Sequence, residues 1–236
     1  MTDLITWIND DDAFPPVSRA MRSPNGLLAA GGDLSTVRLL DAYRQGIFPW
    51  FNPGEPIMWW SPDPRMILVP NEFKASRSLT KILRNNIFQV RFDTAFEQVM
   101  HACAAQRDEQ HGTWISDEMI IAYSKLHQLG YAHSVEVWMS ENLIGGLYGV
   151  SIGRMFYGES MFSHVSNASK IALAHLIRHL ENWQFGMIDC QMYSPHLATL
   201  GAREIPRSEF LVRLKKLVHC EPVSNWKFDD FCPKQA

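Results

Sequence analysis

The first 64 residues are dense in proline, glycine and tryptophan, and one segment within them has the apolar spacing of a helix. Apolar side chains recur at three-residue intervals from Val37 to Tyr43, which places them on one helical face. Ser35 is a suitable N-cap and Gly46 would end the helix. The proline-bound tryptophan segments that follow are expected to be extended. We therefore predict that residues 1–64 form a small N-terminal α/β domain.

From residue 65 onward, short apolar or alternating runs predict strands, and apolar residues three or four apart predict helices. The predicted strands cover 66–70, 88–92, 133–138, 143–152, 154–162 and 186–191. The predicted helices cover 74–84, 93–107, 116–129, 167–183 and 208–218. Asn142 and Gly153 are turn residues that separate three of the strands, which indicates an antiparallel meander.

A meander followed by a long helix and a further strand predicts an α+β fold over residues 65–236. We expect a mixed sheet of six or seven strands with helices on both faces. The Gcn5-related acetyltransferase (GNAT-like) architecture has this order of elements, although such folds serve many functions.

Composition, targeting signals and cysteine spacing limit the kinds of protein that this chain can be. The chain has 236 residues, is 46% hydrophobic and carries a net charge of −3, so no general basic field indicates nucleic acid, although a local basic patch remains possible. The start lacks a signal-peptide pattern and no apolar run approaches the ~18 residues of a membrane span. None of the four cysteines, Cys103, Cys190, Cys220 and Cys232, forms a C-x-x-C pair. We expect a cytoplasmic protein with free thiols and no metal site.

A basic stripe marks the predicted helix at 74–84. Lys74, Arg77, Lys81 and Arg84 follow at spacings of three, four and three, with Arg65 upstream. A solvated helix face is the commoner explanation of such a stripe. The alternative is a phosphate-binding strip, because like charges repel by ~0.2–0.5 kcal/mol per pair and a polyanion would remove that cost.

Two predicted strands carry polar side chains among apolar neighbours. Glu159 lies in the segment 158–163, and Asp189 and Gln191 lie in 186–191. A carboxylate in such surroundings must be hydrogen-bonded, paired or functional, because its desolvation alone is costly. These residues either hold loops at strand ends or form a site that handles protons or cationic groups.

Several motifs follow one another in a recognisable order. They are PNGLLA at 24–29, GGDL at 31–34, GIFPWF at 46–51, WWSPDPR at 59–65, GTWI at 112–115, HSVEVW at 133–138, GESMFS at 158–163, NASK at 167–170 and IDCQ at 188–191. By these motifs nearly the whole chain resembles the bacterial leucyl/phenylalanyl-tRNA–protein transferases. The resemblance implies transfer of Leu, Phe and to a lesser extent Met from aminoacyl-tRNA to proteins that begin with Arg or Lys. It also implies degradation of the product by the N-end rule pathway, a GNAT-like catalytic domain, no metal and no coenzyme A.

The resemblance implies catalytic roles for Asp189, Gln191 and Glu159. Asp189 polarises Gln191, whose side-chain oxygen accepts a hydrogen bond from the attacking amine. Glu159 and Asp189 also offer negative charge to the amine or to the Arg or Lys side chain of the acceptor. Since the ester is already activated, we interpret Gln191 as an aligning group rather than a strong base.

The resemblance also implies the substrate contacts. An apolar pocket for the donor side chain would be lined by Leu147, Met161, Leu176, Leu180 and Ile188. The candidates for stacking on the 3′-terminal adenosine are Trp50, Trp114 and Tyr43, and Ser163 would bond the ester or ribose region. Phosphates of the acceptor stem would meet Arg65, Lys74, Arg77, Lys81 and Arg84. The family carries Met and Phe at some pocket positions, so three leucines here leave the choice between Phe and Leu open.

Three other functions are weighed against this one. A coenzyme-A-dependent N-acetyltransferase usually has a glycine-containing pyrophosphate loop, and residues 163–170 contain no glycine. A non-catalytic tRNA or N-degron binding module would not need the acid and amide pair. A thiol enzyme would use Cys190 with His196, but strict alternation predicts that Cys190 points to the opposite face from Asp189 and Gln191. We expect a monomer, because both substrates are large and need open surface.

Overall fold

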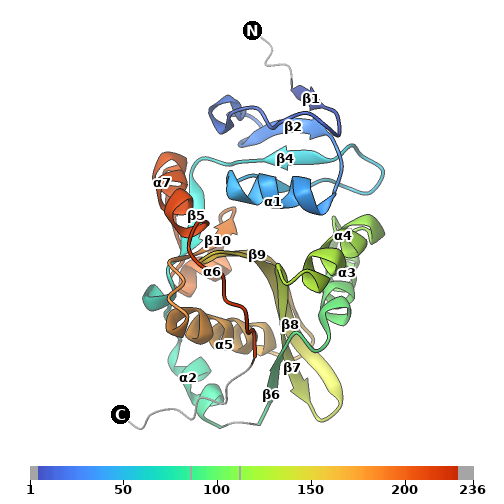
Figure 1. Ribbon diagram of the computed structural model, residues 1–236. Coiled ribbons are helices and arrows are strands. Elements are labelled where there is room, and N and C mark those ends of the chain that lie inside the picture. The colour runs from blue at the N-terminus through green and yellow to red at the C-terminus, as the bar shows by residue number, and fades with distance from the viewer. Residues whose placement is uncertain (1–4, 86, 112, 228–236) are drawn as a thin grey trace.

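The computed structural model describes residues 5–85, 87–111 and 113–227, which form a small and a large sheet (Figure 1). Gly112 and Cys232 lie outside the described residues. The small sheet has the order β1-β2-β4-β3. Its strands are β1 (Thr6–Ile8), β2 (Leu27–Gly31), β3 (Phe48–Pro49) and β4 (Met58–Trp60), accompanied by the 3-10 helix η1 (Val17–Arg19) and helix α1 (Thr36–Arg44).

Helix α1 confirms the predicted N-terminal helix. The Ser35 hydroxyl accepts a hydrogen bond from the Arg38 backbone N–H at 3.3 Å, which caps the first turn. Gly46 follows the helix with φ of +75°, a left-handed conformation that glycine adopts without steric cost. The extended segments predicted beside it become β3 and β4.

The large sheet has seven strands in the order β11-β5-β10-β9-β8-β7-β6. Its strands are β5 (Arg65–Leu68), β6 (Gln89–Phe92), β7 (Ala132–Met139), β8 (Asn142–Ile152), β9 (Met155–Ser163), β10 (Met187–Gln191) and β11 (Arg203–Ile205). The helices of this part are η2 (Pro70–Glu72), α2 (Arg77–Arg84), α3 (Phe96–His111), α4 (Asp117–Gln128), α5 (Ala168–Asn182), α6 (Pro195–Thr199) and α7 (Arg207–Leu217). The pair β9 and β10 is parallel, and the other neighbours are antiparallel.

The α+β class, the mixed sheet and the order of meander, long helix and further strand are confirmed. Helices cover both faces of the sheet, with α5 on one face and α3 and α4 on the other (Figure 1). The predictions missed β1, β2, α6 and β11. All four are only three to five residues long, and such short elements show no usable periodicity.

The basic helix begins later than predicted. The Ser76 hydroxyl accepts the Leu79 N–H at 3.2 Å, which makes Ser76 the N-cap and Arg77 the first helical residue. Lys74 therefore lies before α2, and its backbone N–H donates to the Leu200 carbonyl oxygen at 2.9 Å. Helical spacing relates Arg77, Lys81 and Arg84 to one another, but not to Lys74.

The two sheets share one of two buried hydrophobic clusters, and the second lies between the large sheet and α5. A single buried cluster contains Ile8 of the small sheet, Tyr43 of α1, Tyr157 of the large sheet and Phe210 of α7. The predicted boundary between residues 64 and 65 falls in the connection from β4 to β5 and stays a prediction. Among the described residues, no helix combines the length and apolar character that a membrane span needs.

Candidate active site

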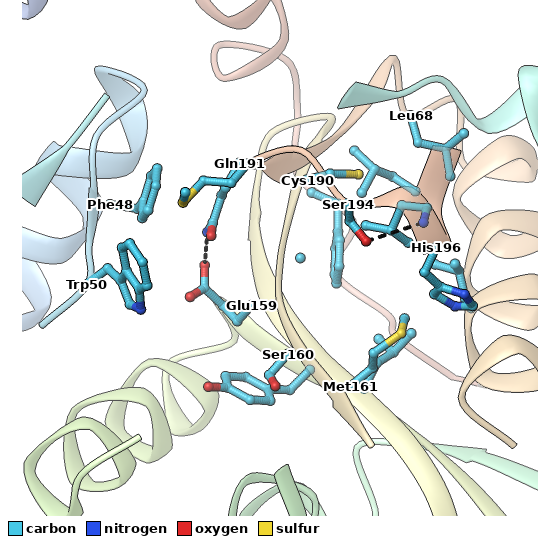
Figure 2. A pocket seen from close by; sticks show the side chains of 18 of the residues that line it. Phe48, Trp50, Leu68, Glu159, Ser160, Met161, Cys190, Gln191, Ser194 and His196 are labelled. Carbon is cyan, nitrogen blue, oxygen red and sulfur yellow. Dashed lines mark hydrogen bonds between the residues drawn. The ribbon is translucent and has the colours of Figure 1, made fainter. Parts of the chain in front are cut away.

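A cavity of about 420 Å³ opens where β9 and β10 stop pairing. The parallel pairing ends with Asp189 beside Tyr157, so Glu159 and Gln191 lie just beyond the last paired residues. Figure 2 shows Phe48 and Trp50, from the small sheet, on the side of the cavity where Glu159 and Gln191 meet. The cavity therefore has walls from both parts of the chain.

A β-bulge places each of the two polar side chains. Tyr148 pairs with Ser160 and Gly149 pairs with Gly158, so Glu159 is an extra residue in β9. Bulges re-aim side chains and are frequent next to active sites. This one directs the Glu159 carboxylate away from the regular alternation of the strand.

The second bulge lies in β10. Ile67 pairs with Asp189 and Met66 pairs with Gln191, so Cys190 is the extra residue, and Gln191 has a φ of +64°. Cys190 packs against the buried cluster on the α5 side of the sheet, whereas Gln191 points the other way, toward Glu159 (Figure 2), so the predicted opposite orientation is confirmed, although Cys190 also lines the cavity. Burial, chiefly, raises the pKa of the Cys190 thiol far above its ordinary range, which argues against a thiolate nucleophile.

Glu159 sits in a cage of hydrogen-bond donors. Its Oε1 accepts the Tyr43 hydroxyl at 2.8 Å and the Gln191 Nε2 at 2.9 Å, and its Oε2 accepts the Tyr123 hydroxyl at 3.4 Å. The hydroxyls of Tyr43 and Tyr123 also contact each other. Burial raises the pKa of Glu159 to about 7 and the charge of Asp189 raises it too, while the three donors lower it. Glu159 therefore exchanges a proton near neutral pH.

The cage also orients Gln191. Since its side-chain nitrogen donates to Glu159, the side-chain oxygen is the atom left to accept a hydrogen bond. Burial and the charge of Glu159 raise the pKa of Tyr43 and Tyr123, so both remain hydroxyl donors. The arrangement can align a neutral amine, and it contains a group that titrates in the range of an α-amine.

Asp189 lies behind this pair and does not reach the Gln191 side chain. It is fully buried and accepts Arg65 Nε at 2.8 Å and Arg65 Nη2 at 2.7 Å. Its Oδ1 also accepts the backbone N–H of Gln191 at 2.9 Å. Asp189 therefore acts on Gln191 through the backbone, and its charge is compensated by Arg65.

Away from Glu159 the cavity is mostly apolar, although Ser194 and His196 also line it on the side of Leu68 and Met161 (Figure 2). The predicted pocket residues Leu147, Met161, Leu176 and Ile188 line it, together with Leu68, Phe156 and Leu173. Leu68 and Met161 lie across the cavity from Phe48 and Trp50 (Figure 2). Among the described residues that line the cavity, the one acid is Glu159.

Comparison with known proteins identifies the family. Residues 67–215 match the leucyl/phenylalanyl-tRNA protein transferase family, and residues 32–63 match the N-terminal domain of that transferase. The chain belongs to this family. It is 62% identical to the leucyl/phenylalanyl-tRNA–protein transferase of Nitrosospira multiformis over 227 residues, 96% of this chain and 98% of the relative. It is also 62% identical to that of Nitrosomonas europaea over 235 residues, 99% of each chain.

Solved structures show weaker likeness. The chain matches a conserved protein of unknown function from Bacteroides thetaiotaomicron with a TM-score of 0.41 and 14% identity, over 69% of this chain and 56% of that one. An aminoglycoside acetyltransferase from an uncultured soil metagenomic sample gives a TM-score of 0.38 and 13% identity, over 61% and 97%. Likeness at this level says nothing of function. Family membership makes the protein an aminoacyltransferase that uses aminoacyl-tRNA and a protein acceptor.

Not every residue implied by the family resemblance lies where it was expected. Tyr43 is fully buried beneath Glu159, so its ring is closed to a stacked base, whereas Trp50 and Trp114 line the cavity. Leu180 is fully buried and is not among the cavity-lining residues. The Ser163 hydroxyl donates to the Val165 carbonyl oxygen at 3.1 Å and accepts the Ser169 N–H at 3.0 Å, and Ser163 lies outside the cavity wall.

The predicted tRNA-binding residues separate into two groups. Lys74, Arg77, Lys81 and Arg84 are exposed, on or just before α2. Arg65 is 1% exposed and its guanidinium binds Asp189, so its assignment to tRNA phosphates is corrected.

Several residues of the site were not predicted from the sequence. Tyr123, on α4, gave no signal, because it is one aromatic residue on the apolar face of a helix. Phe48, beside Trp50 in one of the family motifs, was a detectable candidate. Within the described parts of the chain, no group of three or more His, Cys, Asp or Glu is placed to hold a metal ion.

Proposed function

We propose that the protein transfers Leu, Phe and to a lesser extent Met from aminoacyl-tRNA to the N-terminal α-amine of proteins beginning with Arg or Lys. The product would be marked for N-end rule degradation. The observation that carries this proposal is the Glu159–Gln191 pair at one end of an apolar cavity. Family membership supports the reaction class.

The donor amino acid fits the apolar end of the cavity. Its walls there are mostly aliphatic or aromatic, and a volume of about 420 Å³ accommodates a Leu, Phe or Met side chain. One methylene in such a pocket is worth only ~1–3 kcal/mol, so the pocket accepts more than one apolar side chain. The exposed faces of Trp50 and Trp114 provide stacking surfaces for the terminal adenosine.

The chemistry is aminolysis of an ester. The acceptor ammonium first loses a proton, for which Glu159 has a suitable pKa of about 7. The neutral amine, aligned by the Gln191 side-chain oxygen, attacks the ester carbonyl carbon. The carbon–nitrogen bond forms, the ester carbon–oxygen bond breaks, and the second amine proton passes to the departing ribose oxygen. No metal or coenzyme A takes part in these steps.

Glu159 also supports selection of a cationic acceptor. Asp189 is neutralised by Arg65, which leaves Glu159 as the acid among the described residues of the cavity wall. An ionised Glu159 attracts the cationic side chain of an N-terminal Arg or Lys. The exposed cations of α2 would meet the phosphates of the acceptor stem.

The deciding experiment incubates the protein with Leu-, Phe- or Met-tRNA and a peptide beginning with Arg, without coenzyme A. The same peptide beginning with Ala is the matched control. We expect the Arg peptide alone to gain the mass of one amino-acid residue. Tight tRNA binding without a mass gain would instead indicate a binding module. An acetyl gain that depends on acetyl-coenzyme A would indicate an acetyltransferase.

Two variants locate the chemistry in the same assay. Asp189→Asn and Gln191→Ala should lower the transfer rate and leave tRNA affinity unchanged, because neither side chain belongs to the basic stripe. Full activity of both variants would contradict the catalytic assignment.

We also propose that the protein works as a cytoplasmic monomer, because tRNA and an acceptor protein must reach one cavity together. Sedimentation velocity should give the mass of a single chain, and a concentration-dependent dimer would contradict this.

A further inference from the structure

Arg65 lies at the junction of the small sheet, the large sheet and α7. Its side chain is 1% exposed, and its Cζ lies 4.8 Å from the ring centre of Phe48 and 4.7 Å from that of Phe210. Phe48 belongs to β3 and Phe210 to α7, so three separate parts of the fold meet at one guanidinium. Contacts of this kind fix the plane of an arginine side chain.

A continuous set of hydrogen bonds leads from Arg65 to the cavity. The guanidinium binds both oxygens of Asp189, at 2.8 Å and 2.7 Å. Asp189 Oδ1 then accepts the backbone N–H of Gln191 at 2.9 Å, and the Gln191 side chain donates to Glu159 at 2.9 Å. The orientation of Asp189 is therefore passed on to Gln191, whose side-chain amide aligns the attacking amine.

This arrangement holds a residue in a conformation that it would not adopt by preference. Gln191 has a φ of +64° and follows the bulge at Cys190. A non-glycine residue in the left-handed region needs support from its surroundings. The bond from the Gln191 backbone to Asp189 supplies that support, and Arg65 holds the carboxylate in place.

A role in core packing alone does not account for Arg65. A buried ion pair of this size can often be replaced by apolar side chains without loss of stability. Arg65 Nη1 also has no hydrogen-bond partner among the described residues, which is an uncompensated cost of burial. The bidentate pair is explained by what it does to Asp189 and, through it, to Gln191.

We propose that Arg65 is a positioning residue for aminoacyl transfer, which acts through Asp189 to aim the Gln191 amide at the attacking amine. It does not touch either substrate. The inference rests on the proposed function. It adds that Phe48 and Phe210 couple the small sheet and α7 to the alignment of the reacting groups.

The test uses the full-length protein and compares kcat and KM for Phe-tRNA with an Arg-started peptide as acceptor. Arg65→Lys keeps the charge but loses the planar fork, and it should lower kcat at least tenfold while KM for Phe-tRNA stays within twofold. Arg203→Lys is the matched control. Arg203 lies on the neighbouring strand β11, is exposed, and pairs with Glu72 at 3.2 Å. This control should keep the wild-type kcat.

A double-variant cycle separates positioning from folding. Arg65→Gln, Asp189→Asn and the combined variant are compared at equal folded fraction, measured by near-UV circular dichroism. If Arg65 acts through Asp189, the combined variant is no slower than Asp189→Asn alone. The combined variant leaves no unpaired buried charge. If Arg65→Gln does not fold, the combined variant can still be compared with Asp189→Asn.

The outcomes are distinct. A wild-type protein that transfers no amino acid would contradict the proposed function. If the wild-type protein is active and Arg65→Lys keeps full kcat, the proposed role of Arg65 is wrong. It is also wrong if the rate losses of Arg65→Gln and Asp189→Asn multiply in the combined variant.

Discussion

At the scale of single residues, the decisive feature is a buried carboxylate whose oxygens both accept hydrogen bonds. Glu159 accepts hydrogen bonds from Tyr43, Tyr123 and Gln191. Burial removes the water that would stabilise its charge, and the three donors replace only part of that stabilisation. The result is an acid that is half ionised near pH 7 and that binds Gln191 most strongly when ionised.

We predict that the transfer rate depends on the ionisation of Glu159. Its pKa is about 7, so kcat should rise with pH through about 7 as the carboxylate ionises. Glu159→Gln should lower kcat about 10–100-fold, within the range of general acid–base effects, and remove this limb from the pH profile. The ionisation of the acceptor amine appears separately, in the pH profile of kcat/KM for the peptide. The Glu159→Gln variant should keep this pH dependence. A Glu159→Gln enzyme with the wild-type profile would exclude this role.

The same pKa shift predicts an effect on stability. The pKa of Glu159 is raised from 4.5 to about 7, so the folded state binds the proton more tightly than the unfolded state. The stabilisation from this proton is complete below about pH 4.5 and is lost as the pH rises through about 7. The change in the free energy of unfolding caused by Glu159→Gln should therefore be more favourable at pH 8 than at pH 4.5, by up to about 3 kcal/mol. Urea titrations of both proteins at both pH values measure this difference, and an equal effect at the two pH values would contradict it.

At the scale of elements, two bulges on neighbouring strands create the site. Without the extra residue in β9 and the extra residue in β10, the polar side chains would follow the regular alternation of the sheet. The strands also stop pairing just before them, which opens the cavity between β9 and β10. The catalytic geometry is therefore a property of the irregular strand ends.

Helix α2 carries the prediction for tRNA. Arg77, Lys81 and Arg84 are exposed on it, and each phosphate contact contributes about 0.9 to the slope of log affinity against log salt. Changing the three residues to Gln should weaken tRNA binding and reduce that slope by about 2–3. Lys215→Gln with Lys216→Gln, on the exposed surface of α7, tests for a general charge effect and should change neither value. Filter binding at several salt concentrations measures both, and an unchanged slope in the α2 variant would exclude the stripe from the tRNA site.

The contact between α5 and β8 is also open to test. A Cβ at Gly145 would lie 2.4 Å from the Ala168 Cβ and 3.0 Å from its carbonyl carbon, so α5 can pack this closely only against a glycine. Gly145→Ala should lower the free energy of unfolding by about 1–3 kcal/mol, a typical cost of overpacking. Thermal unfolding measures the change, and Ala168→Gly in the same chain should recover part of it. An unchanged Tm in Gly145→Ala would show that the helix shifts without cost.

At the scale of the whole molecule, the small sheet is part of the catalytic centre. It supplies Trp50 to the cavity wall and Phe48 to both the wall and Arg65, and α1 places the Tyr43 hydroxyl on Glu159. The two sheets are distinct in topology, yet buried residues from both join in one cluster. Catalysis and stability are thus linked across the two parts.

This shared core predicts cooperative unfolding. Calorimetry should give one transition whose calorimetric and van't Hoff enthalpies agree, because the small sheet cannot unfold without exposing the cluster that it shares with the large sheet. Tryptophan fluorescence and far-UV circular dichroism should follow the same urea curve. Two separate transitions would show that the small sheet unfolds independently.

Much of the fold could be predicted from local patterns. The meander, the long helix α5 and the capped helix α1 follow from periodicity and turn residues that each segment carries within itself. Short elements such as β1 and β11 could not be predicted, because their strand geometry comes from pairing with distant segments. The start of α2 depended on a single capping hydroxyl at Ser76.

The sequence by itself determined the family, the order of the longer elements and the group Glu159, Asp189 and Gln191, because these depend on residue types and their spacing. The tertiary structure alone decided how the group works. It paired Asp189 with Arg65 and enclosed Tyr43 beside Glu159. The physical reason is that burial, ion pairing and bulge geometry arise from segments far apart in the chain, so no local pattern encodes them.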